Sequence, residues 1–237
     1  MTDSLQDNLT RVQERIANAA ARAGREATTI TLVAVSKTHP VEALLAAYEL
    51  GVRHFGENRV EEAATKLPAF KQVVRDPAVV FHMIGHLQSR KVDEAVTLFD
   101  RAHSVDSVKL AQRLSRFAEK PLPILLEVNV SGEKSKYGFD GARRDDLFKA
   151  IEVITPLSNL QLDGLMTMAP LVADPQQARP VFRALRELRD ELEARYSDLN
   201  LPQLSMGMTD DFEVAIAEGA TLVRIGRAIF GERYHSG

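Results

Sequence analysis

Thr29-Ile30-Thr31-Leu32-Val33-Ala34-Val35-Ser36-Lys37-Thr38-His39-Pro40 is the stretch of sequence that decides the fold. Apolar and β-branched residues dominate its first half, which predicts a strand buried on both faces, as in a parallel sheet. Four polar side chains, Ser36 to His39, follow at the carboxyl end of this strand, and Pro40 is expected as the first residue of a helix. Because α/β sheets bind ligands at the carboxyl ends of their strands, the stretch also predicts a site.

Strand and helix patterns alternate along the rest of the chain. A helix over residues 4–23, ended by Gly24, precedes the repeat. The eight expected strands cover residues 29–37, 52–56, 79–84, 98–104, 122–130, 160–166, 203–206 and 222–225, and a helical pattern follows each of them. With no linker or shift in composition, this order predicts a single domain over residues 1–237, a (β/α)8 TIM barrel with an extra N-terminal helix. An open doubly wound sheet is the alternative if the fourth or seventh strand is absent.

Three local features accompany this prediction. Ser89 is expected to cap a helix that runs to Thr97. Residues 131–141 contain three glycines and Tyr137, a composition typical of a loop. A long helix is expected over residues 175–196, after a loop that contains prolines.

The composition excludes several classes of function. The 237-residue chain has a formal net charge of -3, with 45% hydrophobic and 27% charged residues, which gives no reason to expect nucleic acid or a membrane surface as a partner. No apolar run is long enough to span a bilayer and the N-terminus does not resemble a signal peptide, so we expect a cytoplasmic protein. The absence of cysteine excludes disulfides, thiolate catalysis and cysteine-ligated metals. A nucleophile must therefore be a lysine, a serine, a threonine or a carboxylate.

In a barrel the carboxyl ends of the strands converge on one mouth, where polar side chains form the candidate site. The residues expected there are Lys37, Asn58, His86, Asn129, Met166 to Met168, Ser205 and Arg224. Taken singly, each is more often a solvated or structural residue than a ligand. Lys37 is the strongest candidate because a whole strand directs it at the mouth. Partial desolvation there would lower the pKa of its amine and create a nucleophile that attacks an aldehyde.

Two small-residue turns near the end of the chain suggest a phosphate site. Residues 205–209 and 224–227 each lead from a strand into a helix, where backbone N–H groups point toward an anion and Gly207 and Gly226 permit close approach. The alternative is that Gly207 only makes a turn and Gly226 only starts a helix. The Lys37 amine could react with an aldehyde, and the two turns opposite could hold a phosphate. Pyridoxal 5'-phosphate has both groups. Arg224 would then face the pyridine nitrogen and, being always charged, would keep that nitrogen unprotonated and the ring a weak electron sink.

Seven motifs, in order, resemble those of the pyridoxal phosphate homeostasis proteins (YggS/PROSC type), over essentially the whole chain. They are Val33-Ala34-Val35-Ser36-Lys37, Phe55-Gly56-Glu57-Asn58, Ile84-Gly85-His86-Leu87-Gln88, Lys136-Tyr137-Gly138-Phe139, Gly164-Leu165-Met166-Thr167-Met168, Leu204-Ser205-Met206-Gly207-Met208 and Val223-Arg224-Ile225-Gly226. The resemblance implies a fold like the N-terminal barrel of alanine racemase, with pyridoxal 5'-phosphate (PLP) covalently bound to Lys37 as an aldimine, a Schiff base.

The same resemblance assigns the other cofactor contacts. It implies that the phosphate is held, mainly through backbone and hydroxyl groups, by Ser205, Met206, Gly226 and Arg227. It places Arg224 against the ring nitrogen, and Asn58 and Met168 along the ring. Arg227 stands where many relatives have a small or hydroxyl residue, so its backbone N–H is the contact expected there.

Three functions fit these residues. The first, implied by the resemblance, is a protein of vitamin B6 homeostasis that binds and buffers PLP and delivers it to PLP-dependent apo-enzymes, with no catalytic residue and no metal. The second is an amino-acid racemase with Lys37 as one base, which needs a second acid/base such as Tyr137 or His86. The third is a Schiff-base aldolase acting on a phosphorylated sugar, for which no acid/base beside the lysine is identified.

We expect the first function, because alanine racemase takes its second base from an additional domain and a partner subunit, and this chain ends after its eighth unit. The same lack of a second domain predicts a monomer. Lys136 is expected to be a solvated loop lysine, with transient cofactor binding at the entrance as the alternative.

Overall fold

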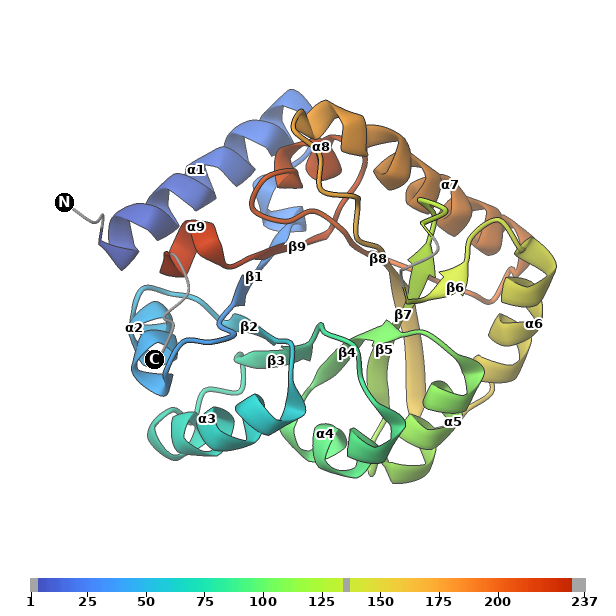
Figure 1. The fold of residues 1–237 in the computed structure, drawn as a ribbon, viewed down its shortest axis with the longest axis horizontal. Helices are drawn as coiled ribbons and strands as arrows, with labels where there is room; N and C mark the ends of the chain where they lie inside the picture. The colour runs from blue at the N-terminus through green and yellow to red at the C-terminus, as the bar shows by residue number, and fades with distance from the viewer. Residues whose placement is uncertain (1–3, 134–136, 232–237) are drawn as a thin grey trace.

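Eight parallel strands form a closed barrel (Figure 1). The computed structural model describes residues 4–133 and 137–231, so Lys136 lies outside the described residues. Around the barrel the strands are β1 (Thr31–Val35), β2 (His54–Glu57), β3 (Val80–Met83), β4 (Arg101–Val105), β5 (Leu122–Asn129), β7 (Leu160–Met166), β8 (Gln203–Ser205) and β9 (Leu222–Ile225). Each pairs with the next, and β9 pairs with β1 in the register Val33 to Arg224 and Ala34 to Ile225. This closure confirms the predicted (β/α)8 barrel over the open sheet.

Helices surround the barrel and cover its outer face (Figure 1). They are α2 (Val41–Glu49), α3 (Val60–Val73), α4 (Val92–Leu98), α5 (Val108–Phe117), α6 (Arg144–Ile154), α7 (Arg179–Arg195), α8 (Phe212–Ala217) and α9 (Arg227–Phe230). The main hydrophobic core lies between the strands and this ring of helices, where apolar strand and helix faces are removed from water.

The leading helix, α1 (Leu5–Arg22), is confirmed as an addition to the repeat. It begins at a capping box, in which the Ser4 hydroxyl accepts from the Asp7 backbone N–H and the Asp7 carboxylate accepts from the Ser4 backbone. Its apolar stripe packs against α8 and α9, and Gly24 follows its end in the left-handed region at a φ of 66°. The helix thus covers the side of the barrel where the chain's first and last strands meet (Figure 1).

Four local predictions need correction. Pro40 is the N-cap of α2 and not its first helical residue. Ser89 caps no helix through its side chain, because residues Ser89–Lys91 form a 3-10 turn and α4 begins at Val92. The loop over residues 131–141 contains a short strand, β6 (Phe139–Asp140), that pairs with the end of β5. The long helix begins as a 3-10 turn, Pro175–Ala178, before α7 starts at Arg179.

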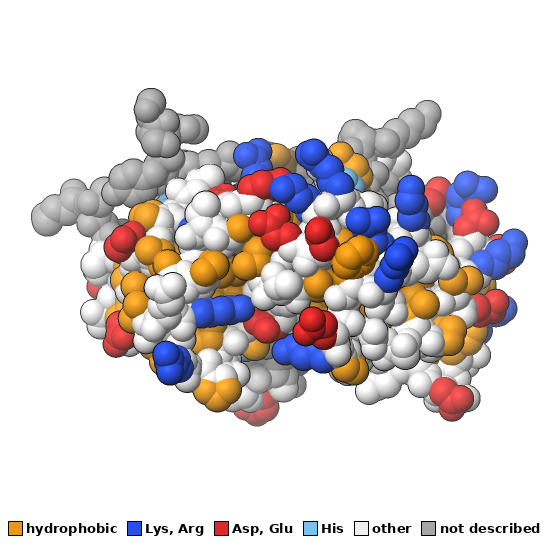
Figure 2. Space-filling view, turned by 90° about the horizontal axis from the view of Figure 1, so that it is seen from below, with side chains coloured by type: hydrophobic (Ala, Val, Ile, Leu, Met, Phe, Trp, Pro, Cys, Tyr) orange, Lys and Arg blue, Asp and Glu red, His pale blue; other side chains and the backbone are white. Residues whose placement is uncertain are grey.

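The surface carries no strong separation of charge on the face seen in Figure 2, where acidic, basic and apolar side chains are interspersed. This agrees with the small formal net charge of -3. Among residues 4–133 and 137–231, we find no helix that is both long enough and apolar enough to cross a membrane.

Candidate small-molecule site at the barrel mouth

A cavity of about 630 Å³ opens at the carboxyl ends of the barrel strands. Its lining includes six of the eight predicted site residues, which are Lys37, Asn58, Met168, Arg224, Gly226 and Arg227. This volume lies within the range that protein pockets for small molecules occupy. The structure therefore brings residues from both ends of the chain to one site, since Lys37 follows β1 and Arg224 lies in the neighbouring β9.

Lys37 lies on a turn whose backbone is unusual. Thr38, directly after it, has a φ of 65° and is the non-glycine residue with positive φ among the described residues. The turn is closed by a hydrogen bond of 3.1 Å from the His39 N–H to the Ser36 carbonyl. Left-handed backbone at a β-branched residue is unfavourable and persists only where the surroundings enforce it.

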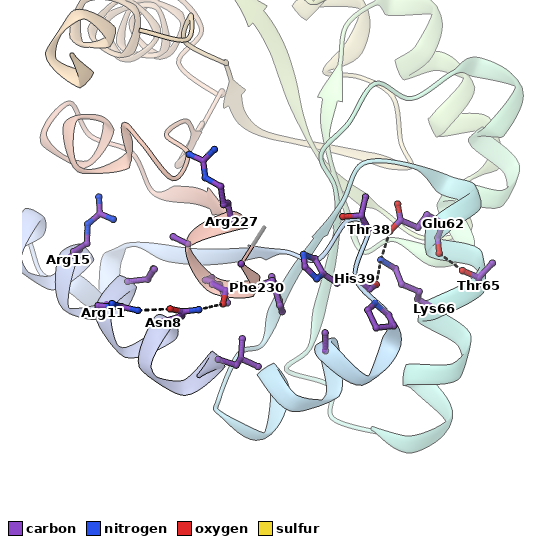
Figure 3. Close-up of a pocket in the computed structure, with 17 residues that line it drawn as sticks. Asn8, Arg11, Arg15, Thr38, His39, Glu62, Thr65, Lys66, Arg227 and Phe230 are labelled. Atoms are coloured by element: carbon purple, nitrogen blue, oxygen red, sulfur yellow. Dashed lines mark hydrogen bonds and ion pairs between the residues drawn. The ribbon is translucent and has the colours of Figure 1, made fainter. Parts of the chain in front are cut away.

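Lys66 and two glutamates form an ion cluster against this turn, and Figure 3 shows two of its members, Lys66 and Glu62, beside Thr38 and His39. The Lys66 ammonium donates to the backbone carbonyls of Ser36, at 3.0 Å, and His39, at 3.2 Å, and so binds both ends of the turn. It also pairs with the carboxylates of Glu57, at 2.7 Å, and Glu62, at 2.8 Å. Each ammonium hydrogen thus has an acceptor, and Lys66 is hydrogen-bonded to the backbone on both sides of Lys37.

The carboxylates of the cluster accept further hydrogen bonds from the turn, although the buried Glu57 Oε2 has no hydrogen-bond partner among the described residues. Glu62 accepts from the Thr38 backbone N–H, and Glu57 accepts from the Ser36 hydroxyl at 2.6 Å. Burial raises the pKa of the Glu57 carboxyl above its ordinary value, and the charge of Lys66 opposes that rise. Sequence reasoning missed Lys66, because a lysine four residues after a glutamate is typical of a solvated helix face.

Arg224 is buried at the inner wall of the cavity. Its guanidinium donates to the Ser205 hydroxyl oxygen at 2.5 Å and to the Thr167 carbonyl at 3.0 Å. Burial lowers the pKa of Arg224 to about 10, and the nearby carboxyls of Asp211 and Glu127 oppose that change. The group is therefore still charged at neutral pH and presents a fixed positive charge to the cavity.

Ser205 and Met206 do not line the cavity. Both side chains are fully buried, and the Ser205 hydroxyl is bonded to Arg224 and to the ring of His103, while Met206 lies in the hydrophobic core. The structure therefore does not place these two side chains where a phosphate in the cavity would touch them. Met208 and Thr209, a few residues further on, line the cavity instead. Thr209 could have been found in the sequence, because it is a hydroxyl residue at the end of the same turn.

The glycines of the two turns have packing roles. Gly207 has a φ of 94°, and a Cβ there would lie 2.6 Å from the Cβ of Ala215 in α8. A Cβ on Gly226 would lie 3.0 Å from the Val35 carbonyl oxygen in β1. The packing contacts alone are enough to require glycine at Gly207. The presence of glycine is therefore no evidence for a bound anion, and close approach of the backbone to an anion stays a prediction at both positions.

His86, Asn129 and Tyr137 are also outside the cavity lining. The His86 imidazole pairs with the Asp106 carboxylate at 3.2 Å and stacks on the Tyr137 ring with a centroid distance of 3.9 Å. The Asn129 amide organises the following loop by accepting from the Ser131 hydroxyl and donating to the Glu133 carbonyl. The mouth therefore divides into a Lys37–Arg224 cavity and a separate polar group around His86.

Glu127, at the end of β5, is a titratable group that sequence reasoning missed. Its side chain is almost fully buried, and burial raises the pKa of its carboxyl to about 7. The charge of Asp106 raises this pKa further, and that of Arg224 lowers it. Glu127 thus changes charge close to neutral pH within reach of the Arg224 guanidinium.

A larger cavity, of about 1420 Å³, lies between α1, α9 and the start of α3 (Figure 3). It shares His39, Arg227 and Gly231 with the first cavity, but Lys37 and Arg224 are not part of its lining. In the described part of the chain, no group of three or more histidine or acidic side chains is arranged to hold a metal ion.

The fold and the cavity define a (β/α)8 barrel protein in which a lysine and an arginine line one cavity at the carboxyl ends of the strands. The chain belongs to the family described as "Alanine racemase, N-terminal domain", whose model matches residues 3–234. It is 44% identical over 230 residues to the pyridoxal phosphate homeostasis protein of Aquifex aeolicus, an alignment that covers 96% of this chain and 97% of the relative. The resemblance found in the seven motifs is thereby confirmed.

Two solved structures are similar to this fold. The structure of PipY from Synechococcus elongatus PCC7942 with PLP bound is 38% identical, with a TM-score of 0.79, over 93% of this chain and all of that one. The alanine racemase of Clostridium difficile 630 is 16% identical, with a TM-score of 0.69, over 99% of this chain and 58% of that one. The second likeness shows the shared barrel alone.

Proposed function

We propose that this chain binds PLP reversibly in the Lys37 cavity and serves PLP homeostasis in the cytoplasm, as a monomer without catalytic turnover. The observation that carries the proposal is that Lys37 and Arg224, separated by almost the whole barrel in sequence, line one cavity. Relatives that align with nearly the full chain are named pyridoxal phosphate homeostasis proteins, and PipY has been solved with PLP bound.

The groups around the cavity fit the parts of this cofactor. Lys37 would hold the cofactor through its amine, the group that would react with the aldehyde that the cofactor would supply. Arg224, Asn58 and Met168 line the cavity, where Arg224 would serve the pyridine nitrogen and the other two the ring. Thr209 offers the phosphate a hydroxyl, together with the backbone at Gly226 and Arg227. Ser205 supports this wall through its hydrogen bond with Arg224.

The same arrangement argues against turnover as a racemase. Arg224 keeps its positive charge and donates, so it does not protonate the pyridine nitrogen. The two side chains considered as a second acid/base, His86 and Tyr137, are stacked on each other and lie outside the cavity lining. Reversible attachment, followed by delivery to PLP-dependent apo-enzymes, is the use that we propose for such a site.

The test is attachment of PLP to the purified protein. We expect the protein to take up added PLP with a visible absorbance band, and mass spectrometry after borohydride reduction to place the adduct on Lys37. Lys37→Ala should lose the band. Lys71→Ala is the matched control, because Lys71 donates to the Leu98 carbonyl on the outer side of the barrel. A protein that takes up no PLP, or that carries the adduct equally in Lys37→Ala, would refute the proposal. Conversion of L-alanine to its D form at a steady rate would refute the absence of turnover.

A further inference from the structure

A continuous chain of hydrogen bonds crosses the interior of the barrel and ends at Arg224. The His54 Nδ1 lies 3.0 Å from the His82 Nε2, and the His82 Nδ1 lies 2.9 Å from the His103 Nε2. The His103 Nδ1 lies 2.8 Å from the Ser205 hydroxyl oxygen, which also accepts from Arg224. Three neighbouring strands, β2, β3 and β4, supply the imidazoles, and the chain then crosses to β8 and β9.

Burial favours the neutral form of the imidazoles of this chain. His82 and His103 are buried, and burial holds the pKa of each ring well below its ordinary value. The positive charges of Arg101 and Arg224 act in the same direction on His103. A neutral imidazole has one N–H donor and one acceptor nitrogen, so each ring can pass a hydrogen bond along in one direction only.

Arg224 fixes that direction. A guanidinium only donates, so the Ser205 oxygen accepts from Arg224. The hydroxyl hydrogen of Ser205 then has one partner left among the described residues, the Nδ1 of His103. His103 therefore carries its hydrogen on Nε2 and donates to His82, which in turn carries its hydrogen on Nε2 and donates to His54. Hydrogen bonds aligned in one direction polarise each other, which strengthens the first acceptor.

We propose that Ser205, His103, His82 and His54 form a directional hydrogen-bond relay that positions Arg224, with the hydrogen of every ring on Nε2. The relay gives Arg224 a buried anchor that is neutral, so the guanidinium keeps its full charge for the cavity. This inference rests on the proposed function only for the group that Arg224 would face, the pyridine nitrogen. The direction of the relay is a property of the protein alone.

The relay also links Arg224 to the far end of the chain of rings. A proton added at the His54 Nδ1 would face the Nε2 hydrogen of His82, so His54 can be protonated only if the whole relay reverses. Burial lowers the pKa of His54, and the charge of Arg101, which is itself paired with Asp163 of β7, lowers it further. Breaking the relay at Ser205 should therefore make His54 easier to protonate.

The direct test is the tautomer of each ring in the full-length protein, labelled with ¹⁵N-histidine and measured without added PLP. Two-bond ¹H–¹⁵N correlation spectra distinguish an Nε2 hydrogen from an Nδ1 hydrogen, and single His→Gln variants assign the signals. We expect the Nε2 form at His54, His82 and His103. An Nδ1 hydrogen on His82 or His103 would overturn the proposal, and this result does not depend on any Ser205 variant.

Ser205→Ala and Ser104→Ala are a matched pair for the coupling. Ser104 is equally buried and lies on β4 beside His103, but its hydroxyl donates to the Gly85 carbonyl, outside the relay. In Ser205→Ala we expect the pKa of His54 to rise by about one pH unit, a tenfold change in proton affinity, and in Ser104→Ala to stay constant. Equal behaviour of the two variants would overturn the proposal.

Titration with PLP tests the positioning of Arg224. We expect the Kd to rise about tenfold in Ser205→Ala, as for loss of one charge-assisted hydrogen bond, and not in Ser104→Ala. Unchanged PLP affinity in Ser205→Ala would overturn the positioning role. If the unaltered protein takes up no PLP, the proposed function fails, and the tautomers and the His54 titration still decide the relay.

Discussion

Replacing Glu127 with glutamine is expected to make the protein more stable than the unaltered chain at alkaline pH, and equally stable at acid pH. Glu127 is 4% exposed at the end of β5, and burial raises the pKa of its carboxyl from 4.5 to about 7. Glutamine has nearly the same shape and never ionises. The two proteins therefore differ in stability only where Glu127 carries a charge in the unfolded or the folded state.

The size of the effect follows from proton linkage. Between pH 4.5 and 7 the folded state binds this proton and the unfolded state releases it, so the stability of the unaltered protein falls as the pH rises through that window. Below pH 4.5 both states are protonated, and above pH 7 both are ionised. The full difference, at about 1.4 kcal/mol per pH unit, amounts to about 3 kcal/mol in favour of Glu127→Gln at pH 8.

Urea unfolding at a series of pH values from 4.5 to 8.5 measures this difference directly. The exposed Glu119→Gln serves as the control for loss of a negative charge, and its difference from the unaltered protein should not change over the window. A difference that stays flat for Glu127→Gln would refute the reasoning. A variant that loses stability as the pH rises would show that attraction between Glu127 and Arg224 outweighs burial of the carboxylate.

Three other substitutions test the packing around the cavity by the same unfolding measurement. Lys66→Met should lower the free energy of unfolding by about 3–5 kcal/mol, because it leaves the Glu57 carboxylate buried without its partner. Adding Glu57→Gln should recover part of that loss. A loss below about 1 kcal/mol would contradict the role of the cluster. Gly207→Ala should lower the free energy of unfolding by at least about 2 kcal/mol more than Gly132→Ala does. Both glycines have positive φ, but only at Gly207 would the added Cβ contact α8. Equal losses would show that backbone strain alone determines the effect. Arg227→Ala should change stability by less than about 0.5 kcal/mol, because its ion pair is exposed, and should leave the Kd for PLP within about threefold if the contact there is made by the backbone.

The barrel was predictable because its signals are local. A strand buried on both faces is a continuous apolar run, and β1 and β5 show such runs in the sequence with no knowledge of their neighbours. Once eight such units are counted, closure follows from the fold class, and with it the meeting of Lys37 and Arg224. The corrections fell at short elements such as β6, where only two residues pair with a neighbour and leave little pattern.

The wall of the cavity was harder to predict, because side-chain direction depends on the curvature of the whole barrel. Ser205 lies at a strand end, as expected, but its hydroxyl points to His103 on β4, across the interior. The burial of Lys66 likewise depends on groups from β2 and from the turn after β1. No spacing within α3 distinguishes such a lysine from a solvated one.

The seam between β1 and β9 determines when during folding the site comes into existence. Lys37 and Arg224 meet only after the first and last strands of the barrel have paired, which is among the contacts of longest sequence separation in the molecule. A partly folded chain that contains only the earlier strands has no second wall for the cavity and, on the proposed function, no affinity for the cofactor.

Ligand binding would then act on the seam itself. A ligand that binds only the closed barrel stabilises it in proportion to the logarithm of its concentration over its Kd. The ligand would contact residues on both sides of the pair formed by β1 and β9. This pair joins strands far apart in the sequence, so its formation costs much loop-closure entropy. Exchange of the backbone hydrogens between β1 and β9, such as the Thr31 N–H bonded to the Thr221 carbonyl, would slow as the ligand concentration rises. A bound ligand would thus hold the first and last strands of the barrel together, and only a fully folded chain would bind it.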